Sequence, residues 1–317
     1  MALGAVILYW IYCEFDFSSV WGALKEMDMF FFILSLFFGV YSHVLRGLRW
    51  RLTLAPLGYH PRRDNCVYSI FIAYAANLVL PRVGEVSRCV VMDRSDNVPM
   101  VQSLGTVVTE RLIDTVMVIA ITLVAVLLQW NVFERFLVEA GSGFSGGTGG
   151  WLQSAGGTAI MILSVAAIIL LVISVLRRMS VWVKIRMLFK QFVEGMLSLM
   201  KMKNSALFVI ETLGIWFCYF MQFYLCFFCF TFSSELSLAA GLLLFVAGSI
   251  AVVVPTPNGA GPWHFAVISI MVIYGVSSTD ASLFALIVHS SQTLLVALLG
   301  LVGLVALRLN NNVKTKK

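Results

Sequence analysis

Three charged residues lie on or just after an interruption in an apolar stretch. Residues 68–80 are apolar and end at Pro81-Arg82-Val83-Gly84-Glu85, with Arg88 one turn further on. A charge at the centre of a bilayer costs about 2.5–3.5 kcal/mol on insertion scales, so these side chains should pair or face water. Arg82 and Glu85 have the spacing of a pair on one helix face. We expect Arg82 to bind a lipid phosphate bidentately, and we expect Glu85 to hold Arg82 in place or to neutralise it when no lipid is bound. An ion pair at a cytoplasmic interface is the alternative.

A second charged group opens the next apolar span. Glu110 and Asp114 share a helix face, and Arg111 has the spacing of a pair with Asp114. Two acids and a base inside a span predict the wall of a polar cavity or a proton-coupling site. A structural salt bridge that braces the preceding segment is an equal alternative.

Basic residues also surround Trp50, at the end of an earlier span. Arg46, Arg49 and Arg51 are typical of a positive-inside anchor with an interfacial Trp. Because Arg46 and Arg49 share a helix face, an entry site for anionic headgroups is the alternative interpretation.

Histidines supply the remaining titratable groups. His264 follows a second interruption, and we expect it to titrate near neutral pH and to face Glu85 across a cavity. His43 and His289 are predicted to make hydrogen bonds between helices rather than ligand contacts.

The sequence lacks the common signatures of an enzyme active site. The sequence has no Walker A loop, no G-x-S-x-G elbow and no H-E-x-x-H pair. Its six cysteines follow no disulfide or metal-site pattern. We therefore expect no cofactor and no metal, and the sequence favours a protein that is not an enzyme.

The second interruption must be positioned together with the first. Residues 242–254 end at Pro255-Thr256-Pro257-Asn258-Gly259-Ala260-Gly261. Each apolar arm has about 13 residues, or about 20 Å of helix, which is too short for a hydrocarbon core of about 30 Å. Paired interrupted segments of this kind indicate the central binding site of a transporter. Ordinary proline kinks in packed helices are the alternative.

The composition requires a membrane. Hydrophobic residues make up 60% of the 317 residues, charged residues 12%, and the mean hydropathy is +0.93. The net charge of +6 comes from basic residues at the ends of apolar segments, where they orient the chain and attract anionic lipids rather than nucleic acid.

We predict a single transmembrane domain over residues 1–317, all-α, with about six crossing helices and two opposed re-entrant hairpins in an inverted-repeat-like arrangement. The hairpins are expected at about 64–102, entering from the cytoplasm, and about 235–280, entering from outside. A cytoplasmic amphipathic segment is expected at about 177–204, and the C-terminus should also be cytoplasmic. The first helix is too short to span, so it is either partly inserted or preceded by further residues. The spans are a short first helix at 1–12, then 29–49, 104–128, 158–176, 206–230 and 283–307.

Four motifs occur in the order expected of one family. They are Leu45-Arg46-Gly47-Leu48-Arg49-Trp50-Arg51, Asn77-Leu78-Val79-Leu80-Pro81-Arg82-Val83-Gly84-Glu85, Glu110-Arg111-Leu112-Ile113-Asp114 and the segment from Pro255 to Gly261. On these motifs residues 29–309 resemble the flippase-like membrane domain of lysylphosphatidylglycerol synthases and its stand-alone relatives.

The resemblance implies a role in moving or presenting lipids between leaflets. In some members the lipid is aminoacylated phosphatidylglycerol, and other relatives are linked to hopanoid or polyprenyl-linked sugar pathways. The soluble aminoacyltransferase domain of the synthases is missing, so lipid aminoacylation is not expected. Asn258 replaces a usual Gly, and His264 stands where Glu is common, which leaves the substrate and any ion coupling open.

We therefore expect a lipid flippase or transporter of a bacterial inner membrane that handles an anionic lipid or lipid-linked intermediate. A membrane-embedded transferase with Glu85 or His264 as general base is one alternative. An accessory subunit that presents lipid to a separate synthase is another. The predicted headgroup residues are Arg46, Arg49, Asn77, Arg82, Glu85, Arg88, Glu110, Arg111, Asp114, Asn258 and His264, and the predicted break residues are Pro81, Gly84, Pro255, Pro257, Gly259 and Gly261.

Overall fold

Helices make up all the regular secondary structure in the described part of the chain. The computed structural model describes residues 2–13, 15–16, 18–130 and 204–315. Residues 1–125 and 202–317 form one compact unit, and the other unit, 126–201, lies almost wholly outside the described residues. The expected span at 158–176 and nearly all of the amphipathic segment at 177–204 therefore lie outside them as well.

Four described helices are long and apolar enough to cross a membrane. They are α3 (Met29–Leu54, extended by the 3-10 turn η1, Ala55–Leu57), α6 (Met100–Leu128), α11 (Ser205–Tyr224, extended by η2, Leu225–Cys229) and α14 (Ser278–Thr315). The prediction of an all-helical membrane protein is confirmed at this level, while the count of six crossings stays a prediction. Two shorter helices precede α3: α1 (Ala2–Tyr12), whose 11 residues span about 16 Å, and α2 (Ser18–Glu26).

The first interruption separates two helices that fold back on each other. α4 (Arg63–Val79) ends before Pro81, and α5 (Val83–Asp96) begins after Arg82, whose backbone is left-handed with φ 67°. The Asn77 side chain on α4 accepts a hydrogen bond of 2.8 Å from the Gly84 amide, one of the donors left free at the start of α5. A Cβ at Gly84 would collide with the carbonyl of Ala73. The hairpin therefore depends on a residue without a side chain at this crossing.

The second interruption is a tighter irregular segment between α12 (Leu238–Ala251) and α13 (Pro262–Ile273). It contains the 3-10 turn η3 (Pro257–Gly259) and left-handed backbone at Asn258 and Gly261. The Asn258 side chain donates to the Thr293 hydroxyl at 2.9 Å. This hydrogen bond holds the second break against α14.

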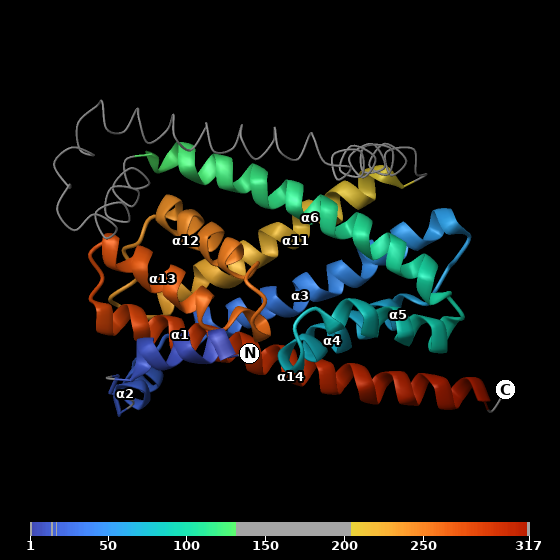
Figure 1. The fold of residues 1–317 in the computed structure, drawn as a ribbon, viewed down its shortest axis with the longest axis horizontal. Coiled ribbons are helices and arrows are strands. Elements are labelled where there is room, and N and C mark those ends of the chain that lie inside the picture. Colours follow the sequence, from blue (N-terminus) through green and yellow to red (C-terminus); the bar gives the residue numbers. More distant parts are fainter. Residues whose placement is uncertain (1, 14, 17, 131–203, 316–317) are drawn as a thin grey trace, which may run out of the picture. The chain divides into compact units, whose positions relative to one another are not determined.

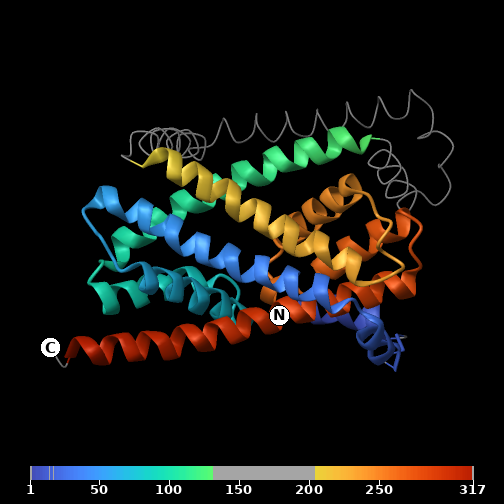
Figure 2. The same cartoon turned by 180° about the vertical axis from the view of Figure 1, so that it is seen from behind.

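The two hairpins point their breaks toward each other within this unit (Figures 1 and 2). α3 packs along α11, and α4 packs against α3, α5, α14 and the second break. α13 packs against α12, α14 and α1. The contact between α4 and η3 agrees with the expectation that the breaks lie close together, and the membrane re-entrance of the hairpins remains a prediction.

An alanine at position 84 tests the close crossing of α4 and α5. We expect Gly84→Ala to lower the stability of the detergent-purified protein by about 1–3 kcal/mol, because the Cβ forces the hairpin apart. Thermal unfolding followed by intrinsic fluorescence measures the change. Gly105→Ala on α6 is the matched control, since a Cβ there meets no atom within 4 Å and Ala favours a helix. Equal melting temperatures for the two variants would contradict the packing described here.

Candidate functional site

Buried ion pairs join α3 to α6 within the described unit. Arg46 pairs with Asp114, and Arg49 places Nη2 2.9 Å from Oδ1 of the same carboxylate. Arg49 also places Nε 3.3 Å from Glu110 Oε1. Arg49 and Glu110 are fully buried. Each guanidinium therefore lies against a carboxylate in the interior, as a buried charge requires.

Residues of α5 close this cluster on a second side. Arg88 Nη1 lies 2.8 Å from Glu110 Oε2, and its Nη2 lies 2.9 Å from Glu85 Oε2. Arg111 Nη2 lies 2.6 Å from Glu85 Oε1, and its Nη1 lies 3.5 Å from Asp114 Oδ2. We call the resulting set the ion network: Arg46, Arg49, Glu85, Arg88, Glu110, Arg111 and Asp114.

Aromatic and hydroxyl side chains surround the ion network. The Arg88 guanidinium lies 4.7 Å from the ring centre of Trp50, whose indole donates to Thr106 Oγ1 at 2.9 Å. Arg46 Nη1 donates to the Tyr219 hydroxyl at 3.0 Å, and that hydroxyl lies 3.0 Å from the hydroxyl of Tyr74. The Trp50 ring and the Tyr219 hydroxyl thus help to orient the guanidinium groups of Arg88 and Arg46.

The ion network carries one positive charge more than its acids neutralise. Four guanidinium groups face three carboxylates. Several buried guanidinium nitrogens also lack a hydrogen-bond partner among the described residues: Nε of Arg46, Nε and Nη2 of Arg88, and Nε of Arg111. For Arg88 Nη2 the 2.9 Å ion pair with Glu85 lacks hydrogen-bond geometry. Unpaired buried donors together with a surplus positive charge are the chemistry of an anion site.

One edge of the ion network is open. The Arg111 and Glu85 side chains are 41% and 25% exposed, whereas those of Arg88 and Glu110 are at most 1% exposed. An anion can therefore reach Arg111 and Glu85 before it reaches the interior arginines.

The structure brings seven of the predicted headgroup residues together and corrects how some of them pair. The predicted pair of Arg111 with Asp114 is confirmed. The predicted pair of Arg82 with Glu85 is wrong, because Arg82 is exposed on left-handed backbone outside α5 and Glu85 pairs with Arg88 and Arg111 instead. The interpretation of Arg46, Arg49 and Arg51 around Trp50 as an interfacial anchor is wrong for Arg46, Arg49 and Trp50, whose side chains are buried. Arg51 is only partly buried, and its Nε donates to the Pro61 carbonyl at 3.0 Å.

The remaining predicted residues lie at the breaks. Asn77 and Asn258 hold the two breaks in place and take no part in the ion network. His264 does not face Glu85: its ring lies 4.5 Å from that of His289 and 5.8 Å from that of Tyr12. For His289 the predicted bond between segments is confirmed, with Nε2 3.0 Å from the Asn258 carbonyl. The His43 ring packs against that of Tyr74 at a tilt of 56°, and its Nδ1 has no partner among the described residues.

Sequence reasoning missed the uncharged groups around the network. Tyr74 and Tyr219 belong to apolar helices, where a tyrosine gives no distinctive signal. Thr106 did give a signal in the sequence, because it lies one turn before Glu110 on the same helix face.

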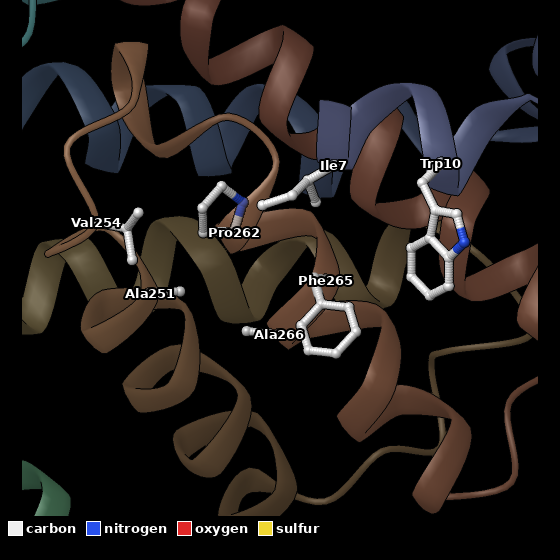
Figure 3. A pocket seen from close by; sticks show the side chains of 7 residues that line it. All are labelled: Ile7, Trp10, Ala251, Val254, Pro262, Phe265 and Ala266. Carbon is white, nitrogen blue, oxygen red and sulfur yellow. The ribbon is translucent and has the colours of Figure 1, made fainter. Parts of the chain in front are cut away.

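Two cavities lie beside α1, away from the ion network. One, of about 440 Å³, is lined without any charged side chain, and its residues approach from α1, α12, α13 and the segment between α12 and α13 (Figure 3). The other, of about 480 Å³, contains Tyr12, His264, His289 and Ser290 in its lining. The lining residues of the first cavity are Ile7, Trp10, Ala251, Val254, Pro262, Phe265 and Ala266.

Within the described ranges no cluster of three or more His, Cys, Asp or Glu side chains has an arrangement that would hold a metal ion.

Residues 1–300 match the family model described as the lysylphosphatidylglycerol synthase TM region, a stretch that includes the ion network and both breaks. The chain belongs to this family. The resemblance on the four motifs is thereby confirmed for the lysylphosphatidylglycerol synthase TM-region family.

A curated relative matches a smaller part of the chain. Over 115 residues this family member is 31% identical to a protein named glycosyltransferase AglD from Haloferax volcanii. The match covers 36% of the chain and 18% of that relative, so the chain spans less than a fifth of the relative's length. No solved structure shows significant similarity to the chain.

Removing a buried carboxylate tests how much the ion network contributes to the stability of the fold. Glu110→Gln leaves Arg49 and Arg88 without their shared partner, and we expect it to destabilise the protein by about 3–5 kcal/mol. Unfolding in detergent, followed by fluorescence, gives the difference. Arg62→Gln is the control, since its ion pair with Asp64 is exposed and contributes about 0–1 kcal/mol. A loss for Glu110→Gln no larger than that for Arg62→Gln would refute the assignment.

Proposed function

We propose that this protein moves or presents an anionic lipid between the leaflets of a membrane, with the ion network as the binding site for the headgroup phosphate. The observation that carries the proposal is the surplus positive charge of the ion network, in which the partly exposed Arg111 adds a fourth guanidinium to three buried ones, together with buried N–H donors of Arg46, Arg88 and Arg111 that are incompletely used. Membership of the lysylphosphatidylglycerol synthase TM-region family supports a lipid-related role.

The charge of the ion network favours an anion over a zwitterion. A buried guanidinium without a counter-charge is costly, and the three acids cannot compensate all four arginines. A phosphate supplies the missing negative charge and accepts several hydrogen bonds at once. Arginine matches it because the planar guanidinium donates two parallel N–H groups.

Glu85 has the geometry of an internal substitute for that phosphate. One of its carboxylate oxygens faces Arg88 and the other faces Arg111, at the open edge of the network. In the empty state it neutralises these two arginines, and a phosphate that enters from the edge takes over both. Arg82, exposed at the first break, would be an outer contact for the arriving headgroup.

The two breaks would convert binding into movement. Glu85 and Arg88 belong to α5, which starts at the first break, and α4 contacts the second break at η3. Displacement of Glu85 would therefore shift the hairpin that touches the second break. In this proposal the hairpins enter from opposite membrane faces, and the segment from Pro255 to Gly261 is the outer gate. A bacterial inner membrane with a cytoplasmic C-terminus remains our expectation.

A second candidate is an accessory protein that presents a lipid-linked substrate to a separate synthase. The partial match to a protein named glycosyltransferase favours a role beside an enzyme that transfers a sugar. A transferase that uses Glu85 as general base has less support, because guanidinium groups engage both carboxylate oxygens.

Lipid movement in liposomes tests the proposal. Purified protein is reconstituted, and the transfer of labelled phosphatidylglycerol, its lysyl derivative, phosphatidylcholine and a polyprenyl phosphate between leaflets is measured. We expect movement of an anionic class in preference to phosphatidylcholine. Arg111→Gln should slow that movement about tenfold or more, since a charge-assisted hydrogen bond contributes about 1.5–3 kcal/mol.

Matched variants separate the ion network from general surface charge. Arg94→Gln removes an exposed arginine of α5 outside the network and should leave movement unchanged. Arg82→Gln tests the outer contact at the first break. Equal rates for Arg111→Gln and wild type would refute the headgroup site. Absence of movement for every lipid, with folded protein correctly inserted, would shift support to the accessory role.

A further inference from the structure

Glu211 is a buried carboxyl group next to the ion network but outside it. It lies on α11, is 8% exposed, and its Oε2 has no hydrogen-bond partner among the described residues. The face of α11 around it covers Arg49: the Arg49 guanidinium lies 5.7 Å from the Phe208 ring centre, and its Nη1 donates to Thr212 Oγ1 at 3.4 Å. Glu211 has no ion pair within 4.0 Å among the described residues, so its charge is not locally compensated.

Few charged groups surround Glu211. The charges that act on it are those of Arg49 on α3 and Arg63 at the start of α4. α3 also carries His43 and Arg46, whereas α12 has no charged residue and η2 has only the thiols Cys226 and Cys229. Glu211 is thus the one acid on α11 placed to balance the surplus charge behind Arg49.

The charge count of the site depends on Glu211. Arg63 is exposed at the start of α4, where water and salt screen its charge. When Glu211 is ionised, four carboxylates therefore balance the four arginines of the ion network, and an incoming phosphate finds no surplus positive charge. When Glu211 holds a proton, the surplus of one positive charge is restored. A buried carboxylate without an ion pair readily takes a proton in place of a counter-ion.

We propose that Glu211 is a proton-binding site that couples protonation to headgroup binding, so that the site takes up protons, at most one per headgroup, when an anionic headgroup binds. The inference rests on the function proposed above and adds its coupling ion. The proton comes from water and binds the Glu211 carboxylate. The arginine charge that ionised Glu211 had balanced then becomes available to the phosphate. By linkage, the phosphate strengthens proton binding by the same factor as the proton strengthens phosphate binding.

The sign of the pH dependence follows from this charge count. Raising the pH removes the proton from Glu211, adds a negative charge beside Arg49 and weakens the attraction for phosphate. Lowering the pH does the opposite. A change of one charge near a buried carboxyl group alters its proton affinity by about tenfold or more, and linkage gives the same factor in lipid affinity.

Binding of a short-chain phosphatidylglycerol to the full-length protein in detergent, from about pH 5 to about pH 9, tests the inference. The phosphodiester keeps a single negative charge over this range, so the lipid itself does not titrate. We expect wild-type affinity to fall about tenfold with rising pH. Glu211→Gln should bind at every pH with the affinity that wild type shows at low pH. Glu235→Gln, which removes an exposed acid, should follow wild type.

Proton uptake gives a second measurement that does not depend on the affinity of the variant. In weak buffer near neutral pH, wild type should take up protons on binding phosphatidylglycerol, and Glu211→Gln should take up none. Binding by Glu211→Gln with the pH slope and proton uptake of wild type would overturn the inference and leave the headgroup site standing. Failure of wild type to bind phosphatidylglycerol above phosphatidylcholine at any pH would overturn both.

Discussion

Moving a guanidinium group from water into a protein interior costs several kcal/mol, and this chain buries three of them almost completely in one place. Arg46 and Arg49 on α3 and Arg88 on α5 meet the acids of α6, so helices far apart in sequence are held by charge as well as by apolar packing. The geometry of α3, α5 and α6 is thereby constrained at a single point.

The two breaks are linked to that constraint through short polar contacts. Asn77 bonds to the backbone across the first break, and Asn258 ties the second break to Thr293 on α14. An asparagine thus fixes each irregular segment where regular backbone hydrogen bonding stops. Since α4 touches both breaks, a change in the pairing of α5 has a short route to η3.

Much of the site was predictable because charged residues are rare in so apolar a chain. Glu85, Arg88, Glu110, Arg111 and Asp114 stand out in the sequence, since each would be costly in lipid without a partner. Local spacing predicts pairs only within one helix, which is why the contact of Arg111 with Asp114 was correct. Spacing failed for Arg82, whose left-handed backbone takes it out of the helix that holds Glu85.

The sequence by itself determined the class of protein, the positions of the two breaks and the family, because hydropathy, Pro and Gly act locally along the chain. Tertiary structure decided which charges meet. Arg46, Arg49 and Trp50 have the pattern of an interfacial anchor, and only the packing of α3 against α4 and α11, with its ion pairs to α6, shows that they are buried. The partner of a buried charge is set by helix packing across long sequence distances, which one-dimensional spacing does not encode.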